Sequence, residues 1–230
     1  MEGSNVSKHR DLGELARSVL EGQFALERED LGEDSHLEKK GMAFDTEAYA
    51  LPGLGHLCIL RMKAFLGIMK METVVLAVTG RDVPLLNLDW VSAAGKETQI
   101  AELYDTQLQP LAAERLAVYQ ALKDRDGDLP DPPPPAPHWY DAILYPCSYH
   151  KAGRKLSERF NCAAESYLSA FVSQLAEAPA CDAAEKGAKV RVFAETLLEK
   201  GGPAVDTVTK LFGPETAKRL ILGHMYGVRD

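Results

Sequence analysis

The chain has 230 residues, of which 46% are hydrophobic, and this suits one compact domain with a sizeable core. Its formal net charge is −8 and no cluster or stripe of lysine and arginine stands out in the sequence, which argues against nucleic-acid binding. No apolar run approaches the roughly 20 residues that a membrane-spanning helix needs. We therefore expect a single domain over residues 1–230, with no nucleic acid and no membrane among its partners and with residues 1–10 flexible.

The first fifteen residues, MEGSNVSKHRDLGEL, contain no apolar signal core and carry acidic residues too early for a transit peptide. This favours a cytoplasmic protein, or a mature form from which a targeting segment has been removed.

The cysteine pattern does not predict a metal site. Cys58, Cys147, Cys162 and Cys181 are widely spaced and include no C-x-x-C pair, whereas a metal cage would require paired spacing. The sequence also contains no G-x-G-x-x-G, G-x-x-x-x-G-K-[ST], H-E-x-x-H or G-x-S-x-G motif. Nothing in it supports a bound nicotinamide, nucleotide or zinc, so we expect no bound metal or cofactor.

The N-terminal half of the chain predicts one helix followed by a meander of strands. Residues 11–30 have apolar positions at helical spacing, and Asp11 can cap their start. Residues 31–41 are charged and loop-like, and residues 65–70 are expected to be a link. The five strand candidates are residues 41–50, 55–63, 73–78, 85–91 and 99–104. Strands that follow one another with short connections indicate an antiparallel sheet rather than βαβ units.

The C-terminal half predicts mostly helices. Residues 124–137 are rich in proline and are expected to form a surface loop, with a linker between two domains as the alternative. Residues 138–149 are rich in aromatic residues and are expected to form a strand that rejoins the sheet. The predicted helices cover residues 107–122, 156–175, 182–200 and 214–226. The economical packing is a three-layer α/β/α sandwich, in which helices cover both faces of a mostly antiparallel sheet.

Asp89 is a candidate functional residue, because it is an acid inside an otherwise apolar strand. A carboxylate buried in a strand loses hydration, which raises its pKa unless a cation or a hydrogen-bond donor lies beside it. A raised pKa is what a proton donor needs at neutral pH. The alternative is that Asp89 faces solvent on a half-exposed strand, which is the commoner situation for an aspartate.

Four short motifs follow one another along most of the chain. They are Asp82-Val83-Pro84 leading to Asp89; Asp105 with Pro110; Trp139, Cys147 and Lys151; and Phe212-Gly213 with Ala217 and Ile221. In their order and spacing they resemble the ferredoxin-dependent bilin reductase family, whose sandwich fold also includes the red chlorophyll catabolite reductases.

The resemblance implies an open-chain tetrapyrrole, such as biliverdin, bound between the sheet and the C-terminal helices. Electrons would come one at a time from reduced ferredoxin, with no protein-bound metal or flavin, and the protein would supply protons to a bilin radical. Asp89 would then be the proton donor, and Lys151 would bind a substrate propionate or be an ordinary exposed lysine. We expect a monomer, with the plastid stroma as the alternative location if a transit peptide has been removed.

The chain departs from the family pattern. Some members carry a Glu and a His on the two strands before the Asp, and Arg61 and Thr73 are expected at these places, as candidate substrate contacts. Arg61 could bind a substrate carboxylate or be an edge-strand arginine. A second acid of the family would fall at Gly202, which leaves Asp206, one turn further, as its replacement. His150 could replace the missing His or be a surface residue, because histidine is the side chain type that can gain or lose a proton near neutral pH.

The sequence leaves several functions open. The first is ferredoxin-dependent reduction of biliverdin or a related bilin, with ferredoxin docked on Lys151, Arg154 and Lys155. The second is a non-catalytic bilin carrier on the same fold, and the third is an interaction module that binds no tetrapyrrole. A hydrolase would need a nucleophile beside a base, but Cys147 and His150 would point to opposite faces of one strand.

Overall fold

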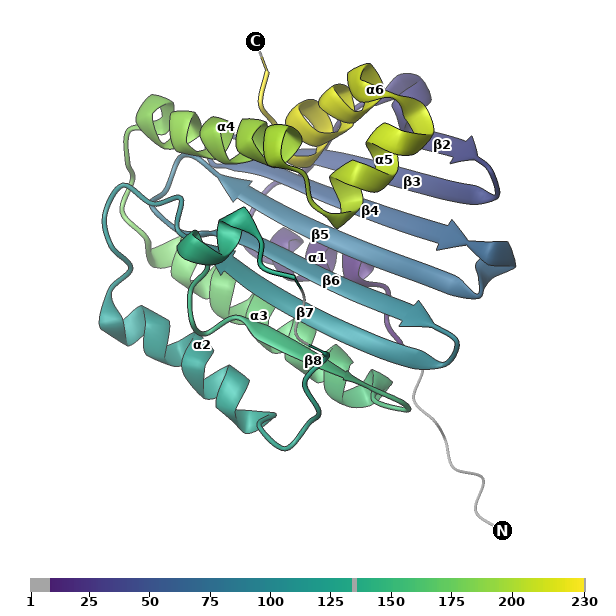
Figure 1. Cartoon of the computed structure of the whole chain (residues 1–230). Helices are drawn as coiled ribbons and strands as arrows, with labels where there is room; N and C mark the ends of the chain where they lie inside the picture. Colours follow the sequence, from purple (N-terminus) through teal and green to yellow (C-terminus); the bar gives the residue numbers. More distant parts are fainter. Residues whose placement is uncertain (1–8, 134–135, 230) are drawn as a thin grey trace.

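The computed structural model describes residues 9–133 and 136–229. The expected flexible N-terminus therefore lies almost entirely outside the described residues, as do residues 134–135 of the proline-rich loop. A central antiparallel sheet is covered by helices on both faces (Figure 1). This arrangement confirms the α/β/α fold class that the sequence predicts.

The sheet has eight strands, ordered β1-β3-β4-β5-β6-β7-β8, with β2 paired to β3. Every pairing is antiparallel. The strands are β1 (Glu27–Arg28), β2 (His36–Lys39), β3 (Met42–Leu51), β4 (Gly55–Ala64), β5 (Met69–Val78), β6 (Leu85–Ala93), β7 (Lys96–Tyr104) and β8 (Tyr149–Gly153).

The predicted meander corresponds to β3 through β7. Strands β4 to β7 are longer than predicted because tight hairpins join β4 to β5 and β6 to β7: a single 3₁₀ turn, η2 (Phe65–Gly67), leads from β4 into β5 where a link was expected. The stretch expected to be a loop, residues 31–41, instead contains the 3₁₀ turn η1 (Gly32–Ser35) and β2.

Three helices cover one face of the sheet, which we call the α3 face: α1 (Leu12–Glu21), α2 (Ala113–Arg125) and α3 (Ser157–Glu177). The opposite face, which we call the α4 face, is covered by α4 (Ala183–Lys200), α5 (Pro203–Phe212), α6 (Pro214–Lys218) and the π-helical segment η4 (Arg219–Met225). None of the helices in the described ranges combines the length and apolar character that crossing a membrane requires.

The first helix shows how local sequence sets these elements. The carboxylate of Asp11 accepts a hydrogen bond from the N–H of Glu14 at 2.8 Å and so caps α1. Leu12, Leu15 and Leu20 lie on one side of the helix and are buried against the sheet. The helix ends at its C-cap, Gly22, earlier than the predicted residue 30.

Alternating residues of each central strand belong to different cores, as the period of two requires. On β4, Leu57 and Ile59 join the core under α1 and α3, whereas Cys58 and Leu60 face the C-terminal helices. Strand β4 therefore presents apolar side chains to the helices on both faces of the sheet.

Two predictions for the C-terminal half were wrong. Residues 138–149 form the 3₁₀ turn η3 (Trp139–Ile143) and a further turn, with Leu144 in a single antiparallel bridge to Tyr104, and the regular strand that joins the sheet is β8. The carboxylate of Asp141 accepts from the N–H of His138 at 2.8 Å, which favours the turn, and Pro146 cannot donate in a strand ladder. Helix α5 was not predicted, although Pro203 occupies the first helical position, where proline is favoured.

Candidate functional site

A cavity of about 230 Å³ lies between the α4 face of the sheet and the C-terminal helices. Its floor comes from alternate residues of β5, β6 and β7, and its roof from α4, α5, η4 and the turn η3. The floor residues are Met71, Thr73, Asn87, Asp89, Val91, Ile100, Glu102 and Tyr104. The roof includes Tyr140, Phe193, Leu197, Val205, Ile221, Met225 and Tyr226.

Strand register brings part of the predicted site together. A straight row crosses the sheet through Leu60, Thr73, Asp89, Ile100 and His150, each opposite the next. All of these residues therefore share the α4 face. Asp89 and Thr73 lie on the cavity floor, and His150 lies at the sheet edge beyond it.

Asp89 is held by two side chains that donate to its carboxylate. The hydroxyl of Thr73 donates to Oδ1, and Nδ2 of Asn87 donates to Oδ2 at 2.7 Å. Burial raises the pKa of Asp89 to about 6, and the nearby charge of Glu102 acts in the same direction, while these two hydrogen bonds act against it. Asp89 thus has the raised pKa that its place in an apolar strand suggested.

Glu102 is a second acid on the cavity floor that the sequence reasoning missed. Its side chain accepts a hydrogen bond from the hydroxyl of Tyr104 and lies 2.9 Å, Oε1 to Nε2, from His150. The amide of Asn87 also lies 3.4 Å from Glu102 Oε2, so Asn87 bridges the two carboxylates. Glu102 lies on the same face of a predicted strand as Ile100 and Tyr104. Only the pairing of that strand with β6 places Glu102 beside Asp89.

Arg61 does not reach the cavity, contrary to expectation. Leu60 is the residue opposite Thr73, and a shift of one position moves a strand residue to the other face. On the α3 face the guanidinium of Arg61 binds Asp11 at 2.6 and 2.7 Å and Glu47 at 2.5 Å. The structure therefore gives Arg61 a place in an ion-pair network behind the sheet.

Lys151 also lies away from the cavity, on the α3 face of β8. Its Nζ donates to the carbonyl of Leu129 at 3.0 Å and binds Asp131 at 2.7 Å. Its side chain is only 9% exposed, so it cannot serve a surface patch together with Arg154 and Lys155. Lys151 therefore does not provide the expected contact with a substrate propionate. It also does not contribute to the expected ferredoxin-docking surface with Arg154 and Lys155.

Asp206 is exposed on α5 and does not line the cavity, although Gly202, Ala204 and Val205 just before it do. The register of α5 turns its side chain toward the loop at Gly201 instead. Glu102, on the neighbouring strand, is the second acid that the structure places beside Asp89.

Three aromatic side chains of the roof, Tyr140, Phe193 and Tyr226, gather near Tyr104 of the floor. Phe193 lies against Tyr226, with ring centroids 5.5 Å apart, and Tyr104 lies between Tyr140 and Phe193 at 5.7 and 4.9 Å. Burial raises the pKa of Tyr226, so its hydroxyl stays protonated. Such a roof suits a flat, conjugated ligand.

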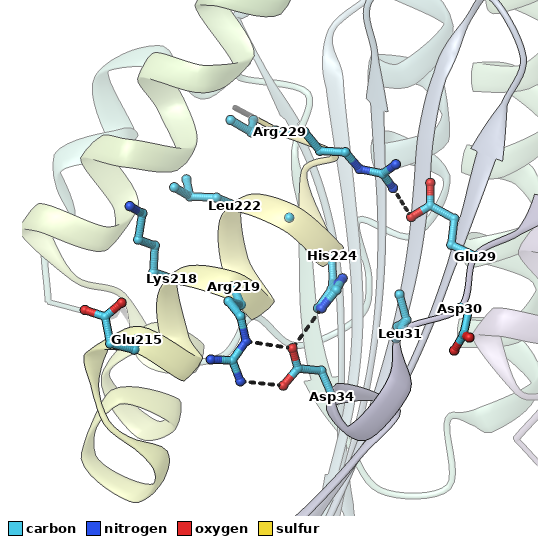
Figure 2. Close-up of a pocket in the computed structure, with 12 residues that line it drawn as sticks. Glu29, Asp30, Leu31, Asp34, Glu215, Lys218, Arg219, Leu222, His224 and Arg229 are labelled. Carbon is cyan, nitrogen blue, oxygen red and sulfur yellow. Dashed lines mark hydrogen bonds and ion pairs between the residues drawn. The ribbon is translucent and has the colours of Figure 1, made fainter.

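A second and larger cavity, of about 740 Å³, lies on the other side of η4. Figure 2 shows the carboxylate of Asp34 between Arg219 and His224. Two guanidinium nitrogens bind it at 2.9 and 3.0 Å, and Nε2 of His224 lies at 3.1 Å. Across the same cavity Arg229 pairs with Glu29 (Figure 2). We interpret these pairs as a latch that fixes η4, whose opposite side lines the first cavity.

The latch gives a stability prediction. The hydrogen bonds of Arg219 lower the pKa of Asp34, and burial offsets this only in part. Asp34→Asn is expected to lower the free energy of unfolding at pH 7 by roughly 1.5–3 kcal/mol, the usual worth of hydrogen bonds to a charged group. Because the pKa of Asp34 is lowered in the folded state, the variant loses this free energy of unfolding in full above about pH 4. The difference from the wild type shrinks as the pH falls further.

Urea unfolding at pH 7 and at low pH measures this effect. Asp30→Asn is the matched control, because Asp30 borders the same cavity but is exposed and, among the described residues, its side chain bonds only to the nearby N–H of Gly32. Equal stabilities for the two variants would contradict the latch.

The described residues contain no group of three or more His, Cys, Asp or Glu side chains arranged to hold a metal ion. The cavity floor carries two carboxyl groups, those of Asp89 and Glu102, which the amide of Asn87 bridges.

No protein-family model and no curated protein matches this chain. Among solved structures, it is similar to phytochromobilin synthase from tomato, crystallised in complex with biliverdin. The TM-score is 0.71 with 13% sequence identity, over 94% of this chain and 82% of the other. The chain thus shares the fold of a biliverdin-binding protein.

Proposed function

We propose that this chain binds a linear tetrapyrrole of the biliverdin type under the C-terminal helices and reduces it with electrons from ferredoxin. One observation carries the proposal: a carboxyl group with a pKa of about 6, Asp89, lies on the floor of an aromatic-roofed cavity. The likeness of fold to a protein crystallised with biliverdin supports the choice of ligand.

The chemistry requires protons as well as electrons. Reduction of one double bond takes up two electrons and two protons; reduced ferredoxin would supply the electrons singly. Asp89 would donate a proton to the bilin, and Thr73 and Asn87 would stabilise the carboxylate that remains, since both donate to it. With electrons from ferredoxin and protons from side chains, the reaction needs no protein-bound flavin or metal.

Glu102 and His150 would supply the second proton. His150 is partly exposed at the sheet edge and lies 2.9 Å from Glu102, which is itself on the cavity floor. This pair leads from solvent to the cavity floor without crossing the roof. Asn87 donates to both carboxylates and so positions them, but its amide does not carry a proton between them.

The cavity volume of about 230 Å³ lies below the roughly 300–1,000 Å³ of sites that enclose a drug-sized ligand. A tetrapyrrole would therefore extend into the opening or displace part of the roof. Helix α5 and Tyr140 are the segments we expect to move, since η4 is fixed by the Asp34 latch.

The pKa of Asp89 sets an expected pH dependence. At saturating bilin and ferredoxin, the conversion rate should be constant below about pH 6 and fall above it, as Asp89 loses its proton. Glu102→Gln removes a charge that helps to raise this pKa. The variant should therefore lose activity at a lower pH than the wild-type protein and be severalfold slower at pH 7.

Initial rates across the pH range measure this shift. Glu199→Gln, an exposed change of the same kind on α4, is the control and should leave the profile unchanged. A Glu102→Gln profile that coincides with the wild-type one would remove Glu102 from the proposal.

An anaerobic titration with biliverdin, followed by a ferredoxin-reducing system, tests the function itself. Saturation at one bilin per chain and loss of the biliverdin absorbance on reduction support the reductase. Binding without conversion would indicate the carrier instead, and no binding would contradict both.

A further inference from the structure

Four loops lie side by side at one end of the sheet, because every second connection between antiparallel strands lies at the same end (Figure 1). Each loop lies beside the next one, because the strands that carry successive loops are hydrogen-bonded neighbours in the sheet. We call this surface the hairpin end, and it consists of residues 39–42, 64–69, 93–96 and 153–155.

The hairpin end is basic although the chain is acidic. Its loops contain no acidic residue, and Glu38 and Glu158 are the exposed acids that border it. Its exposed basic residues, with two on the flanking strands, are Lys39, Lys40, Lys63, Lys70, Lys96, Arg154 and Lys155. Within the described part of the chain, none of the six lysines forms an ion pair. These residues are far apart in the sequence, and the pairing of their strands brings them together on one surface.

The apex of the hairpin end is apolar. Phe65, Leu66 and Ile68 are 66%, 104% and 64% exposed, so the side chain of Leu66 is fully open to solvent. Among the described residues, only Val118 and Val192 are other large hydrophobic side chains with comparable exposure. Three exposed apolar side chains on one projecting turn are unusual for a surface that contacts only water.

The same turn is conformationally strained. Phe65 and Leu66 have φ values of 52° and 57°, in the left-handed region that bulky residues rarely adopt. Glycine or asparagine would make the turn without strain. Packing within the protein does not explain the choice of Phe and Leu, since neither is buried.

We propose that the hairpin end docks on an anionic lipid membrane, with Phe65, Leu66 and Ile68 inserted among the acyl chains. Lys63 and Lys70 lie opposite each other on the two strands, one step behind the apex, at the level of the lipid phosphates. The other basic residues then face the anionic surface. An acidic protein would satisfy the lysines, but a projecting apolar apex fits a fluid lipid layer better than a preformed protein surface. This inference does not depend on the proposed function. It departs from the expectation of no membrane partner, which rested on the lack of an apolar run long enough to span a bilayer and does not bear on docking at the membrane surface.

Sedimentation of the full chain with vesicles tests the proposal. Binding is expected to vesicles of phosphatidylcholine mixed with phosphatidylserine, to weaken with added salt, and to be much weaker with phosphatidylcholine alone. Leu66→Ser should weaken binding at least about tenfold, since one apolar side chain no longer inserts. Lys63→Glu should also weaken it by at least about fivefold.

Matched changes elsewhere provide the controls. Val192→Ser and Lys210→Glu alter exposed residues on α4 and α5 and should leave vesicle binding unchanged. Failure to bind the mixed vesicles, or binding that Leu66→Ser does not weaken, would overturn the proposal. Binding to heparin or polyglutamate without binding to vesicles would overturn it as well and indicate an acidic macromolecule as the partner.

Discussion

Asp89→Asn is expected to slow bilin reduction by roughly 10²–10⁴-fold, the usual contribution of a positioned proton donor. The amide has nearly the same size, and its oxygen can still accept from Thr73. Bilin affinity should therefore change little, and the loss should appear in the rate of conversion. Single-turnover kinetics with saturating bilin measures it directly.

The same variant should be more stable than the wild-type protein at high pH. Because the folded-state pKa of Asp89 is raised from 3.8 to about 6, its contribution to stability is present below pH 3.8 and lost as the pH rises through 6. Removing the acid should stabilise the fold at pH 8 by up to about 3 kcal/mol, at 1.36 kcal/mol per pKa unit. The gain should vanish near pH 4.

Asp206→Asn is the matched control for both effects, because Asp206 is exposed and lies outside the cavity. It should alter neither the rate nor the pH dependence of stability. If Asp206→Asn slows reduction and Asp89→Asn does not, the loop acid that the sequence suggested is the donor, and our assignment of Asp89 is wrong.

Arg61→Met is expected to lower the free energy of unfolding by about 3–5 kcal/mol, because it leaves two partly buried carboxylates without their cation. The side chains of Arg61, Asp11 and Glu47 are 19%, 27% and 19% exposed. Bilin binding by the folded variant should not change, since Arg61 lies on the α3 face. Chemical denaturation and a biliverdin titration on the same sample separate the two effects.

The cost of Arg61→Met should depend on pH. Burial acts to raise the pKa values of Asp11 and Glu47, but hydrogen bonds, including those of Arg61, lower both overall. The stability that they contribute is therefore present above about pH 4 and lost as the pH falls. The difference between variant and wild type should shrink in acid.

Arg28→Met is the control for this variant. Arg28 lies 3.9 Å from the same Glu47 but is mostly exposed, so its removal should cost at most about 1 kcal/mol. Equal costs for the two arginines would contradict the ion-pair network that we assign to Arg61.

Successive apolar strands with short connections made much of the sheet predictable. Short turns between neighbouring strands leave antiparallel pairing as the economical topology. Asp89 stood out because a single acid interrupts such a strand. The longer extent of β5, by contrast, depends on a hairpin at Phe65–Gly67 that contains residues with left-handed backbone, which sequence propensity does not favour.

Register limited what the sequence could say about the site. Arg61 and Leu60 differ by one position, but that position decides which face a side chain occupies. Glu102 could be matched with Asp89 only once β6 and β7 were aligned, with Asn87 opposite Glu102. Lys151 follows a predicted strand that proved to be mostly a turn, so its face could not be foreseen.

One experiment tests the central claim most directly: anaerobic mixing of the biliverdin-loaded protein with reduced ferredoxin, followed by absorbance, for the wild type and Asp89→Asn. We predict that the wild type passes through a transient bilin radical to a reduced product. In the variant the radical should accumulate and product formation should be slower by roughly 10²–10⁴-fold. Equal rates of product formation, or no change of the bilin spectrum in the wild type, would contradict the account.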